Sequence, residues 1–326
     1  MNKKCCAWVS TVSLLVIYLG LIKAGVAQNY PFKPIRLVVP QSAGGSTDLV
    51  ARPLAQRAAE GFKSAVVVDN RPGAGSIIGT DLVAKAPADG YTLLAVAVSF
   101  SMSPSLYKKL PFDPLTDFAP ISLLTSMPNL MVVHPAEPIY SVRDFIRVAK
   151  SHQGQLNYSS SGLATGTYMS MELFKYLTAI QMQHVPYKGG APSVAALMSH
   201  EVNACLATIS TALPHVKSGR LRGLAVSTLR RSMVLPEMPT IDEAGVAGYD
   251  YSSWIGLLAP AKTAQTIVQS WHRQVVLALQ ASEIKALLQL EGSEAVGDTP
   301  QAFGRRIKSE IERWRAVGLA AGMKPE

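Results

Sequence analysis

The amino-acid sequence predicts an α/β fold with mostly parallel strand pairing, arranged as two lobes. Short apolar runs of strand length alternate along the chain with longer segments whose apolar residues recur every three to four positions. Two segments rich in proline, glycine or tyrosine interrupt this alternation and are interpreted as crossings between the lobes. The chain has 326 residues, of which 48% are hydrophobic, and this is enough for about two domains with cores of their own.

The N-terminal 27 residues are predicted to be a secretory signal peptide and not part of this fold. Two lysines precede an apolar stretch at residues 8–22, and small residues at positions 24–27 follow it. The alternative is a retained membrane anchor, but the stretch is shorter than the roughly 20 residues that a spanning helix needs. We therefore expect cleavage after Ala27 and export of the mature chain.

Charge and cysteine content narrow the classes of function. The formal net charge is +9 at pH 7, which includes three lysines of the predicted signal peptide, and the other basic residues are scattered without a nucleic-acid-binding motif. We therefore expect no nucleic-acid partner. Cys205 is the one cysteine beyond the predicted signal peptide, so the mature chain has no internal disulfide and we expect this side chain to be buried as a small apolar group.

The β-strands are predicted where short runs are rich in Val, Ile and Leu, as in strands that are buried on both faces. In chain order these runs are residues 35–40, 65–69, 92–98, 130–134, 224–227 and 255–259. The helices are predicted where the 3.6-residue period is clearest. These segments are residues 48–59, 142–150, 167–177, 192–198 and 267–279. Pro53 lies inside the first helix and is expected to kink or shorten it, because proline lacks a backbone N–H.

The two predicted crossings divide the chain into lobes. At residues 125–129, Pro128 interrupts the apolar run before a new strand, and at residues 245–254 glycines and tyrosines lead into another strand. The predicted first lobe is residues 28–128 with 249–326, and the predicted second lobe is residues 129–248. Architectures with two hinges close around a ligand by rotation of the lobes, so this division predicts a binding cleft.

Three glycine-bearing turns between a strand and a helix are candidate anion sites. Each exposes unpaired backbone N–H groups and the positive end of a helix dipole. The residues concerned are Gln41, Ser42, Ala43, Gly44, Gly45 and Asp48 in the first turn, Ser161, Gly162, Thr165 and Thr167 in the second, and Gly189 and Gly190 in the third. One such turn is better explained as an ordinary capped loop, and Asp48 is interpreted as a helix cap. Three turns on both sides of a predicted hinge favour a bound anion.

The sequence motifs of common enzyme classes are absent. There is no G-x-S-x-G elbow and no GK[ST] phosphate loop, and the glycines of residues 71–86 are spaced one residue too far apart for a dinucleotide fingerprint. His200 and Glu201 begin like a zinc-binding helix, but Ala204 stands where the second histidine is needed. Nothing in the sequence places a base beside Ser161. We therefore expect no enzyme activity, no metal and no cofactor.

Several motifs follow one another along the chain in a characteristic order. They are YPFKPIRLVVP, VVVDNRPGAGSIIG, ADGYTLL, LYKKLPFDP, HVPYKGG, LPHVKSGRLRGLAV, MPTIDEAG and SSWIGLLAPA. This series resembles the Bug family of solute receptors, which are the extracytoplasmic receptors of tripartite tricarboxylate transporters. The resemblance extends from about Tyr30 to the C-terminus.

The resemblance implies a type II periplasmic-binding-protein fold, in which two α/β lobes joined by two hinge crossings enclose a di- or tricarboxylate or an aromatic acid. It adds Ser99 and Ser101, at the end of the third predicted strand, and Ala164, Tyr187 and Ala207 to the candidate ligand-binding residues. It also implies a monomeric periplasmic receptor that delivers its ligand to the subunits of an integral-membrane permease. The alternative is a receptor that docks, when loaded, on a membrane sensor.

Some residues depart from the pattern of that family. Gln41, Ser42 and Ala43 replace an aromatic residue and two prolines of the first loop, and Ala207 stands where aspartate is frequent. An aspartate facing the cleft would favour an amine and disfavour an anion. Its absence predicts an anionic ligand without a free amino group, held against Gln41 and Ser42 by side-chain as well as backbone bonds.

Overall fold

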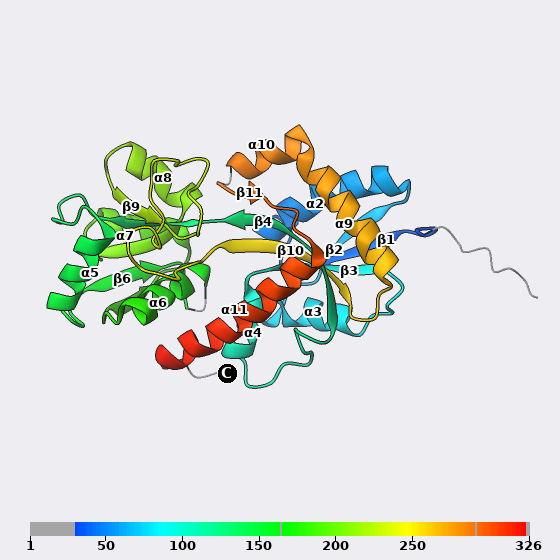
Figure 1. The fold of residues 1–326 in the computed structure, drawn as a ribbon, viewed down its shortest axis with the longest axis horizontal. Helices are drawn as coiled ribbons and strands as arrows, with labels where there is room; N and C mark the ends of the chain where they lie inside the picture. Colours follow the sequence, from blue (N-terminus) through cyan, green and yellow to red (C-terminus); the bar gives the residue numbers. More distant parts are fainter. Residues whose placement is uncertain (1–29, 164, 291, 324–326) are drawn as a thin grey trace, which may run out of the picture.

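The computed structural model describes residues 30–163, 165–290 and 292–323, so the predicted signal peptide and Ala164 lie outside the described residues. Within these residues the chain forms two β-sheets, each flanked by helices, and the two α/β lobes lie side by side (Figure 1). The predicted fold class is therefore confirmed. None of the described helices is long and apolar enough to span a lipid bilayer.

The sheet of the first lobe has six strands in the order β11-β4-β10-β3-β1-β2. Their bounds are β1 (Ile35–Val39), β2 (Val66–Asn70), β3 (Thr92–Ala97), β4 (Phe118–Met127), β10 (Ser253–Pro260) and β11 (Glu294–Ala295). β1 pairs in parallel with β2 and β3, whereas β10 is antiparallel to both of its neighbours, β3 and β4. β10 therefore enters the sheet against the direction of the parallel strands.

Helices cover both faces of this sheet. They are α2 (Ser46–Phe62), the 3-10 turn η1 (Ala74–Ser76), α3 (Ile77–Ala84), α4 (Ser99–Leu106), α9 (Gln265–Gln280), α10 (Ser282–Leu290) and α11 (Pro300–Ala320). α2 and α9 bury Leu54 and Trp271 in one apolar cluster with the sheet. α3, α4 and α11 bury Val83, Met102 and Trp314 in another. The first lobe is therefore a three-layer structure with a core on each side of the sheet.

The sheet of the second lobe has five strands in the order β7-β6-β8-β5-β9. Their bounds are β5 (Asn129–Val133), β6 (Asn157–Ser160), β7 (Gln183–Pro186), β8 (Ala204–Thr208) and β9 (Arg222–Val226). The helices are α5 (Val142–Ser151), α6 (Gly166–Thr178), α7 (Gly190–Met198) and α8 (Ile209–Lys217). Phe145 of α5 and Phe174 of α6 pack on one side of the sheet, and Leu197 of α7 and Ala212 of α8 pack on the other.

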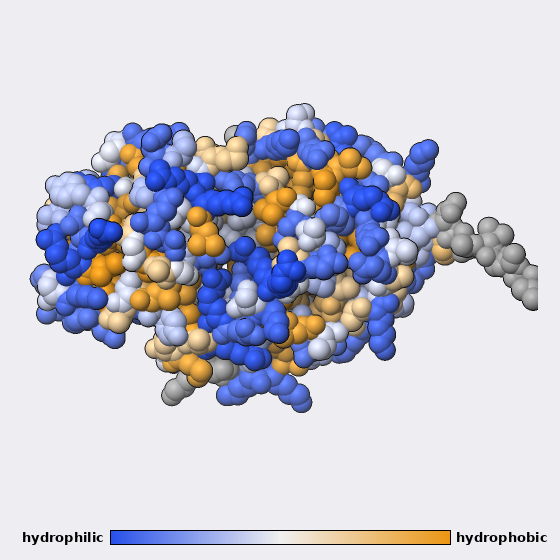
Figure 2. All heavy atoms as spheres, in the orientation of Figure 1, coloured by the Kyte–Doolittle hydropathy of each residue, from blue (hydrophilic) through white to orange (hydrophobic). Residues whose placement is uncertain are grey.

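The two lobes share part of their apolar core. The cluster that contains Trp314 of α11 continues through Tyr249, Tyr251 and Trp254 to the helices α5 and α6 of the second lobe. Both tyrosines are fully buried. On the face shown in Figure 2, hydrophilic residues cover most of both lobes and the apolar ones form separate patches. Apolar burial therefore stabilises the junction between the lobes as well as each lobe.

The two crossings between the lobes lie next to each other. β4 ends at Met127 in the first sheet and β5 begins at Asn129 in the second. The return crossing leads into β10, where Ser253 pairs with Met127. The Ser227 hydroxyl accepts a hydrogen bond from the Asn129 N–H (2.7 Å) and donates one to the Tyr251 carbonyl (2.8 Å). Ser227 therefore links the two crossings. The exact residues at which one lobe ends and the other begins stay a prediction.

Two expectations from the sequence are wrong. Five of the nine strand pairings between described residues are antiparallel, because the strands beside the crossings, β4, β5 and β10, run against their neighbours. α2 is also longer than predicted and continues through Pro53 to Phe62. A proline in a helix removes one hydrogen bond, but burial of Ala51, Leu54 and Ala58 against the sheet keeps this helix in place.

Candidate functional site

A cavity of about 440 Å³ lies between the two lobes. The described residues that line it are Gln41, Ser46, Leu49, Val50, Ala97, Val98, Ser99, Met102, Thr125, Met127, Thr165, Gly166, Thr208, Ser210, Ser253, Trp254, Ile255, Leu287, Leu288 and Ser293. They come from the first lobe, from both crossing strands and from the second lobe. A cavity that both lobes line beside a pair of crossings is a typical place for a small ligand.

Four helices begin at this cavity. Ser46 is the first residue of α2, Ser99 of α4 and Gly166 of α6, and Thr208 directly precedes α8. The first N–H groups of a helix have no partner within it, and the helix dipole places positive charge there. No side chain caps α2, α4 or α8, so their N–H groups can bind an anion in the cavity. Two of the four helices belong to each lobe.

The described residues that line the cavity include no acidic, basic or histidine side chain. Their polar groups are hydroxyls and the amide of Gln41. An anion would therefore be held by helix amino ends and neutral donors, whereas an ammonium group would meet no opposite charge.

Apolar side chains form the remaining wall of the cavity. Leu49 and Val50 of α2 lie on one side, Trp254 belongs to the crossing strand β10, and Leu287 and Leu288 belong to α10. Trp254 is only 1% exposed, and its indole N–H donates a hydrogen bond to Glu310. The cavity therefore combines a donor-rich part with a part suited to a hydrocarbon body.

The first predicted loop is held in shape by Asp48. Its carboxylate accepts hydrogen bonds from the Gly44 N–H (2.8 Å), Arg52 Nε (2.8 Å) and Asn70 Nδ2 (3.0 Å). Burial by itself would raise the pKa of Asp48, but the bonds from Arg52, Gly44 and Asn70 outweigh burial and hold the pKa below its ordinary value. Gly44 adopts a positive φ of 79° here. Asp48 thus fixes the loop beside Gln41, and the expectation that it caps α2 is wrong, because no side chain caps this helix.

A cluster of hydroxyls shapes the second predicted loop. Ser161 Oγ lies 3.1 Å from Thr165 Oγ1 and 2.7 Å from Thr167 Oγ1, and the Ser161 N–H donates to Thr167 Oγ1. Beside them Ser160 Oγ lies 2.7 Å from Nε2 of His184, whose pKa is lowered by burial. Ser160 is fully buried and His184 is partly buried, so their contact holds the loop in shape.

The structure brings only some of the predicted residues to the cavity. Gln41, Ser99 and Thr165 line it. The predicted residues that do not line it are Ser42, Ala43, Gly44, Gly45, Asp48, Ser101, Ser161, Gly162, Thr167, Tyr187, Gly189, Gly190 and Ala207, and Ala164 lies outside the described residues. Their assignment to the ligand stays a prediction.

The sequence reasoning missed several residues that line the cavity. Thr208 ends β8 and Ser210 lies in the first turn of α8, at a strand-to-helix turn like the predicted ones, but no glycine marks this place. Trp254 lies within the motif SSWIGLLAPA, where only its apolar character was apparent. Leu287 and Leu288 belong to α10, which was not predicted as a helix and lies at the edge of the first lobe (Figure 1).

Two α/β lobes joined by two adjacent crossings, with a cavity that both lobes line, define the class of two-lobed solute-binding proteins. Residues 50–323 match the family described as "Tripartite tricarboxylate transporter family receptor". The chain belongs to this family, which is a family of solute-binding receptors and not of enzymes. The predicted family resemblance is therefore confirmed.

Curated and solved relatives agree with this assignment. Protein BugT of Bordetella pertussis is 33% identical over 321 residues, which cover 97% of each chain. The solved structure of Rpa4515 from R. palustris with adipate is 36% identical, has a TM-score of 0.72 and covers 91% of this chain and all of its own. MatC from Rhodopseudomonas palustris with bound malate is 30% identical, has a TM-score of 0.68 and covers 89% of this chain and all of its own.

Proposed function

We propose that this protein is a periplasmic receptor that captures a small carboxylate between its lobes and delivers it to a permease of the tripartite tricarboxylate type. The observation that carries the proposal is the convergence of four helix amino ends, two from each lobe, on a cavity whose described lining has no ionisable side chain. The solved relatives with adipate and malate hold dicarboxylates, and this supports the same class of ligand here.

The ligand that fits best is a di- or tricarboxylate or an aromatic acid without an amino group. Helix amino ends and hydroxyls suit carboxylate oxygens, and the wall formed by Trp254, Leu287 and Leu288 suits an apolar body. An amino acid would bring an ammonium group to a lining without a described carboxylate, which costs desolvation without compensation.

Closure of the lobes requires donors on both sides of the ligand. A ligand that shifts an open-to-closed ratio from 1:99 to 99:1 must bind the closed form better by about 5.5 kcal/mol. Hydrogen bonds to a charged group contribute roughly 1.5 to 3 kcal/mol each, so two to four bonds made only on closure suffice. Helices from one lobe alone would bind both forms equally and would not drive closure.

We also propose that the predicted loop residues beside the cavity approach the ligand on closure. Gly162 precedes Thr165, which lines the cavity, and has a positive φ of 131°. A Gly162→Leu variant should lose carboxylate binding while it remains folded. The matched control is Gly154→Leu, which replaces another glycine of positive φ (76°) outside the described cavity lining. Equal affinities of the two variants would refute this assignment.

A thermal-shift screen of the mature chain tests the class of ligand. The panel would include aliphatic dicarboxylates, citrate, aromatic acids, amino acids and polyamines. A ligand at 100 times its dissociation constant adds about 2.7 kcal/mol of stability, so the correct class gives a clear rise in Tm, and calorimetry then gives its affinity. Tight binding of an amino acid, with no binding of simple carboxylates, would contradict the proposal.

Delivery to a permease needs a separate test, because a sensor would also recognise the closed lobes. Deletion of the gene should abolish uptake of the identified carboxylate, and expression of the wild-type chain should restore it. Uptake that continues unchanged after deletion would contradict delivery and would favour the alternative, a receptor that docks on a membrane sensor.

A further inference from the structure

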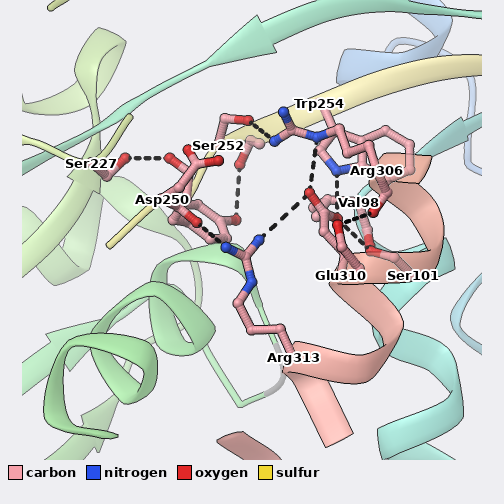
Figure 3. Close-up of polar contacts among 12 residues, drawn as sticks. Val98, Ser101, Ser227, Asp250, Ser252, Trp254, Arg306, Glu310 and Arg313 are labelled. Atoms are coloured by element: carbon pink, nitrogen blue, oxygen red, sulfur yellow. Dashed lines mark hydrogen bonds and ion pairs between the residues drawn. The ribbon is translucent and has the colours of Figure 1, made fainter. Parts of the chain in front are cut away.

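Glu310 of α11 is a buried carboxylate directly behind the wall of the cavity. Its side chain is 2% exposed. Oε2 accepts hydrogen bonds from the Ser101 hydroxyl (2.7 Å) and from the Trp254 indole N–H (2.8 Å), as Figure 3 shows. Oε1 accepts a bond from Arg306 Nε (2.9 Å) and lies 3.7 Å from a terminal nitrogen of Arg313. The carboxylate is therefore fully paired, as a buried charge must be.

Both neutral donors belong to elements that form the cavity. Trp254 lines the cavity itself. Ser101 lies in the first turn of α4, two residues after Ser99, which also lines the cavity. The Val98 N–H donates to the Trp254 carbonyl (3.1 Å). One carboxylate oxygen thus holds together two parts of the first-lobe wall, the indole ring and the amino end of α4.

The two arginines extend this network to the return crossing. A terminal nitrogen of Arg306 donates to the Ser252 hydroxyl (2.8 Å), and one of Arg313 donates to the Asp250 carbonyl (2.6 Å) (Figure 3). α11 also contacts α6, whose first residue, Gly166, lines the cavity from the second lobe. Glu310 therefore contacts the cavity wall through Trp254, and Arg306 and Arg313 link it to the return crossing.

We propose that Glu310 is a positioning residue for ligand binding: it fixes the Trp254 indole and the amino end of α4 in the arrangement that receives the ligand. This inference rests on the proposed carboxylate-binding function. Glu310 does not touch the cavity, since it is absent from the described lining. Its effect on the ligand is transmitted through Trp254 and Ser101, while Arg306 and Arg313 keep its charge paired and tie it to the crossing.

The primary test is the affinity of Glu310→Gln for adipate, measured by calorimetry. Glutamine keeps the size of the side chain but loses the charge that both donors and both arginines bind. We expect the affinity to fall about tenfold, which corresponds to loss of a fraction of one charged hydrogen bond. The matched control is Glu312→Gln on the exposed face of the same helix, which should bind adipate as the wild type does.

A double-mutant cycle identifies the route of the effect. Trp254→Phe keeps an aromatic ring but removes the N–H that Glu310 binds. Because Glu310→Gln weakens and Trp254→Phe removes the same bond, the double variant should lose little more affinity than the weaker-binding single variant. Ser101→Ala is a milder variant, and it should weaken adipate binding about threefold. Its matched control is Ser105→Ala, which removes only a bond to the Met102 carbonyl and should leave adipate binding unchanged.

Affinity separates positioning from simple stabilisation. A purely structural role would lower the Tm of Glu310→Gln and leave the affinity of the folded protein unchanged. That result, or full additivity in the cycle, would overturn the proposal.

If the wild type binds no adipate, hydrogen exchange of the backbone amides tests the positioning role instead. Residues 98–106 and 250–254 should exchange faster in Glu310→Gln than in Glu312→Gln. Equal exchange would overturn the positioning role, whereas the missing adipate binding would count against the proposed function alone.

Discussion

At the scale of single residues, position 208 is where an introduced charge should affect ligand binding most. It lines the cavity and directly precedes α8, whose amino end no side chain caps. We predict that Thr208→Asp weakens binding of the best carboxylate at least a hundredfold. Two carboxylates about 5 Å apart repel each other by about 3 kcal/mol at an effective dielectric constant of 20, and the introduced side chain would also cap the helix.

The matched control for this change is Thr208→Asn. Asparagine has the shape of aspartate without its charge, so calorimetry should give an affinity within about threefold of the wild type. This corresponds to a change in binding free energy of less than about 1 kcal/mol. If Asp and Asn weaken binding equally, the loss is steric, and the electrostatic account of the cavity is wrong.

Asp48 gives a prediction about stability and pH. Hydrogen bonds from Arg52, Gly44 and Asn70 hold the pKa of Asp48 below its ordinary value of 3.8 despite burial. A group with a lowered folded pKa stabilises the protein above its unfolded pKa and loses this contribution as the pH falls through the folded value. Asp48→Asn should therefore cost about 1 to 2 kcal/mol at pH 7, and the difference from the wild type should shrink below about pH 4. Denaturant unfolding curves measured from pH 7 to pH 3 check this. A difference that stays constant with pH would contradict it.

Three predicted residues, Gln41, Ser99 and Thr165, line the cavity, whereas the orientation of side chains at the end of a strand was harder to predict. Ala207 was placed at the cavity, yet it lies in the apolar core, and its neighbour Thr208 lines the cavity. Side chains alternate between the faces of a strand, and a run such as ACLAT carries no polar alternation that fixes the phase. Ser101 was assigned to the ligand through the family resemblance, but in the structure it lies in α4 and its hydroxyl donates to Glu310, 209 positions away.

At the scale of elements, the contact between α6 and the return crossing should be sensitive to one methyl group. A Cβ at Gly166 would overlap the Tyr251 hydroxyl and lie 3.2 Å from Ser253 Oγ. We predict that Gly166→Ala displaces the start of α6 from the cavity and weakens carboxylate binding about tenfold or more. Tyr251→Phe removes the hydroxyl and makes room, so the double variant should recover most of the affinity. Affinities of the two single variants and the double variant check this, and a double variant no better than Gly166→Ala would contradict it.

Elements with a clear local pattern were predicted, including β5 and β10 at the crossings, whereas β4, β6, β7 and β8 were not. β1, β3 and α9 follow from apolar runs and from the 3.6-residue period. β4 and β6 were missed, since their sequences FAPISLLTSM and NYSS mix proline or serine with apolar residues. Their strand form depends on pairing with β10 and β8, which are distant in the sequence. This is tertiary context, which a local pattern does not contain.

At the scale of the whole molecule, the donors of both lobes should make the ligand close the receptor. Saturating carboxylate should lower the radius of gyration measured by small-angle X-ray scattering, because the lobes rotate together about the two crossings. Thr208→Asp at the same ligand concentration should keep the unliganded value. A wild-type radius that does not change on binding would contradict closure.

The two-lobed fold was predictable from the sequence, but the full lining of the cavity was not. The order of motifs and the two crossings indicated the architecture. The cavity itself brings together α2, α8, β10 and α10, which begin at residues 46, 209, 253 and 282. Only the assembled structure brings Leu287 and Thr208 to one cavity, since no local pattern links them.

The central claim is that helix amino ends of both lobes bind a carboxylate in a cavity whose described lining has no ionisable side chain. Calorimetric titration with a matched pair of ligands tests it most directly: the carboxylate with the largest thermal shift and its amide, for example adipate and adipamide. The account predicts about micromolar affinity for the carboxylate, near −8 kcal/mol, and at least hundredfold weaker binding of the amide. Equal affinity for the amide, or binding of the amide alone, would contradict the account.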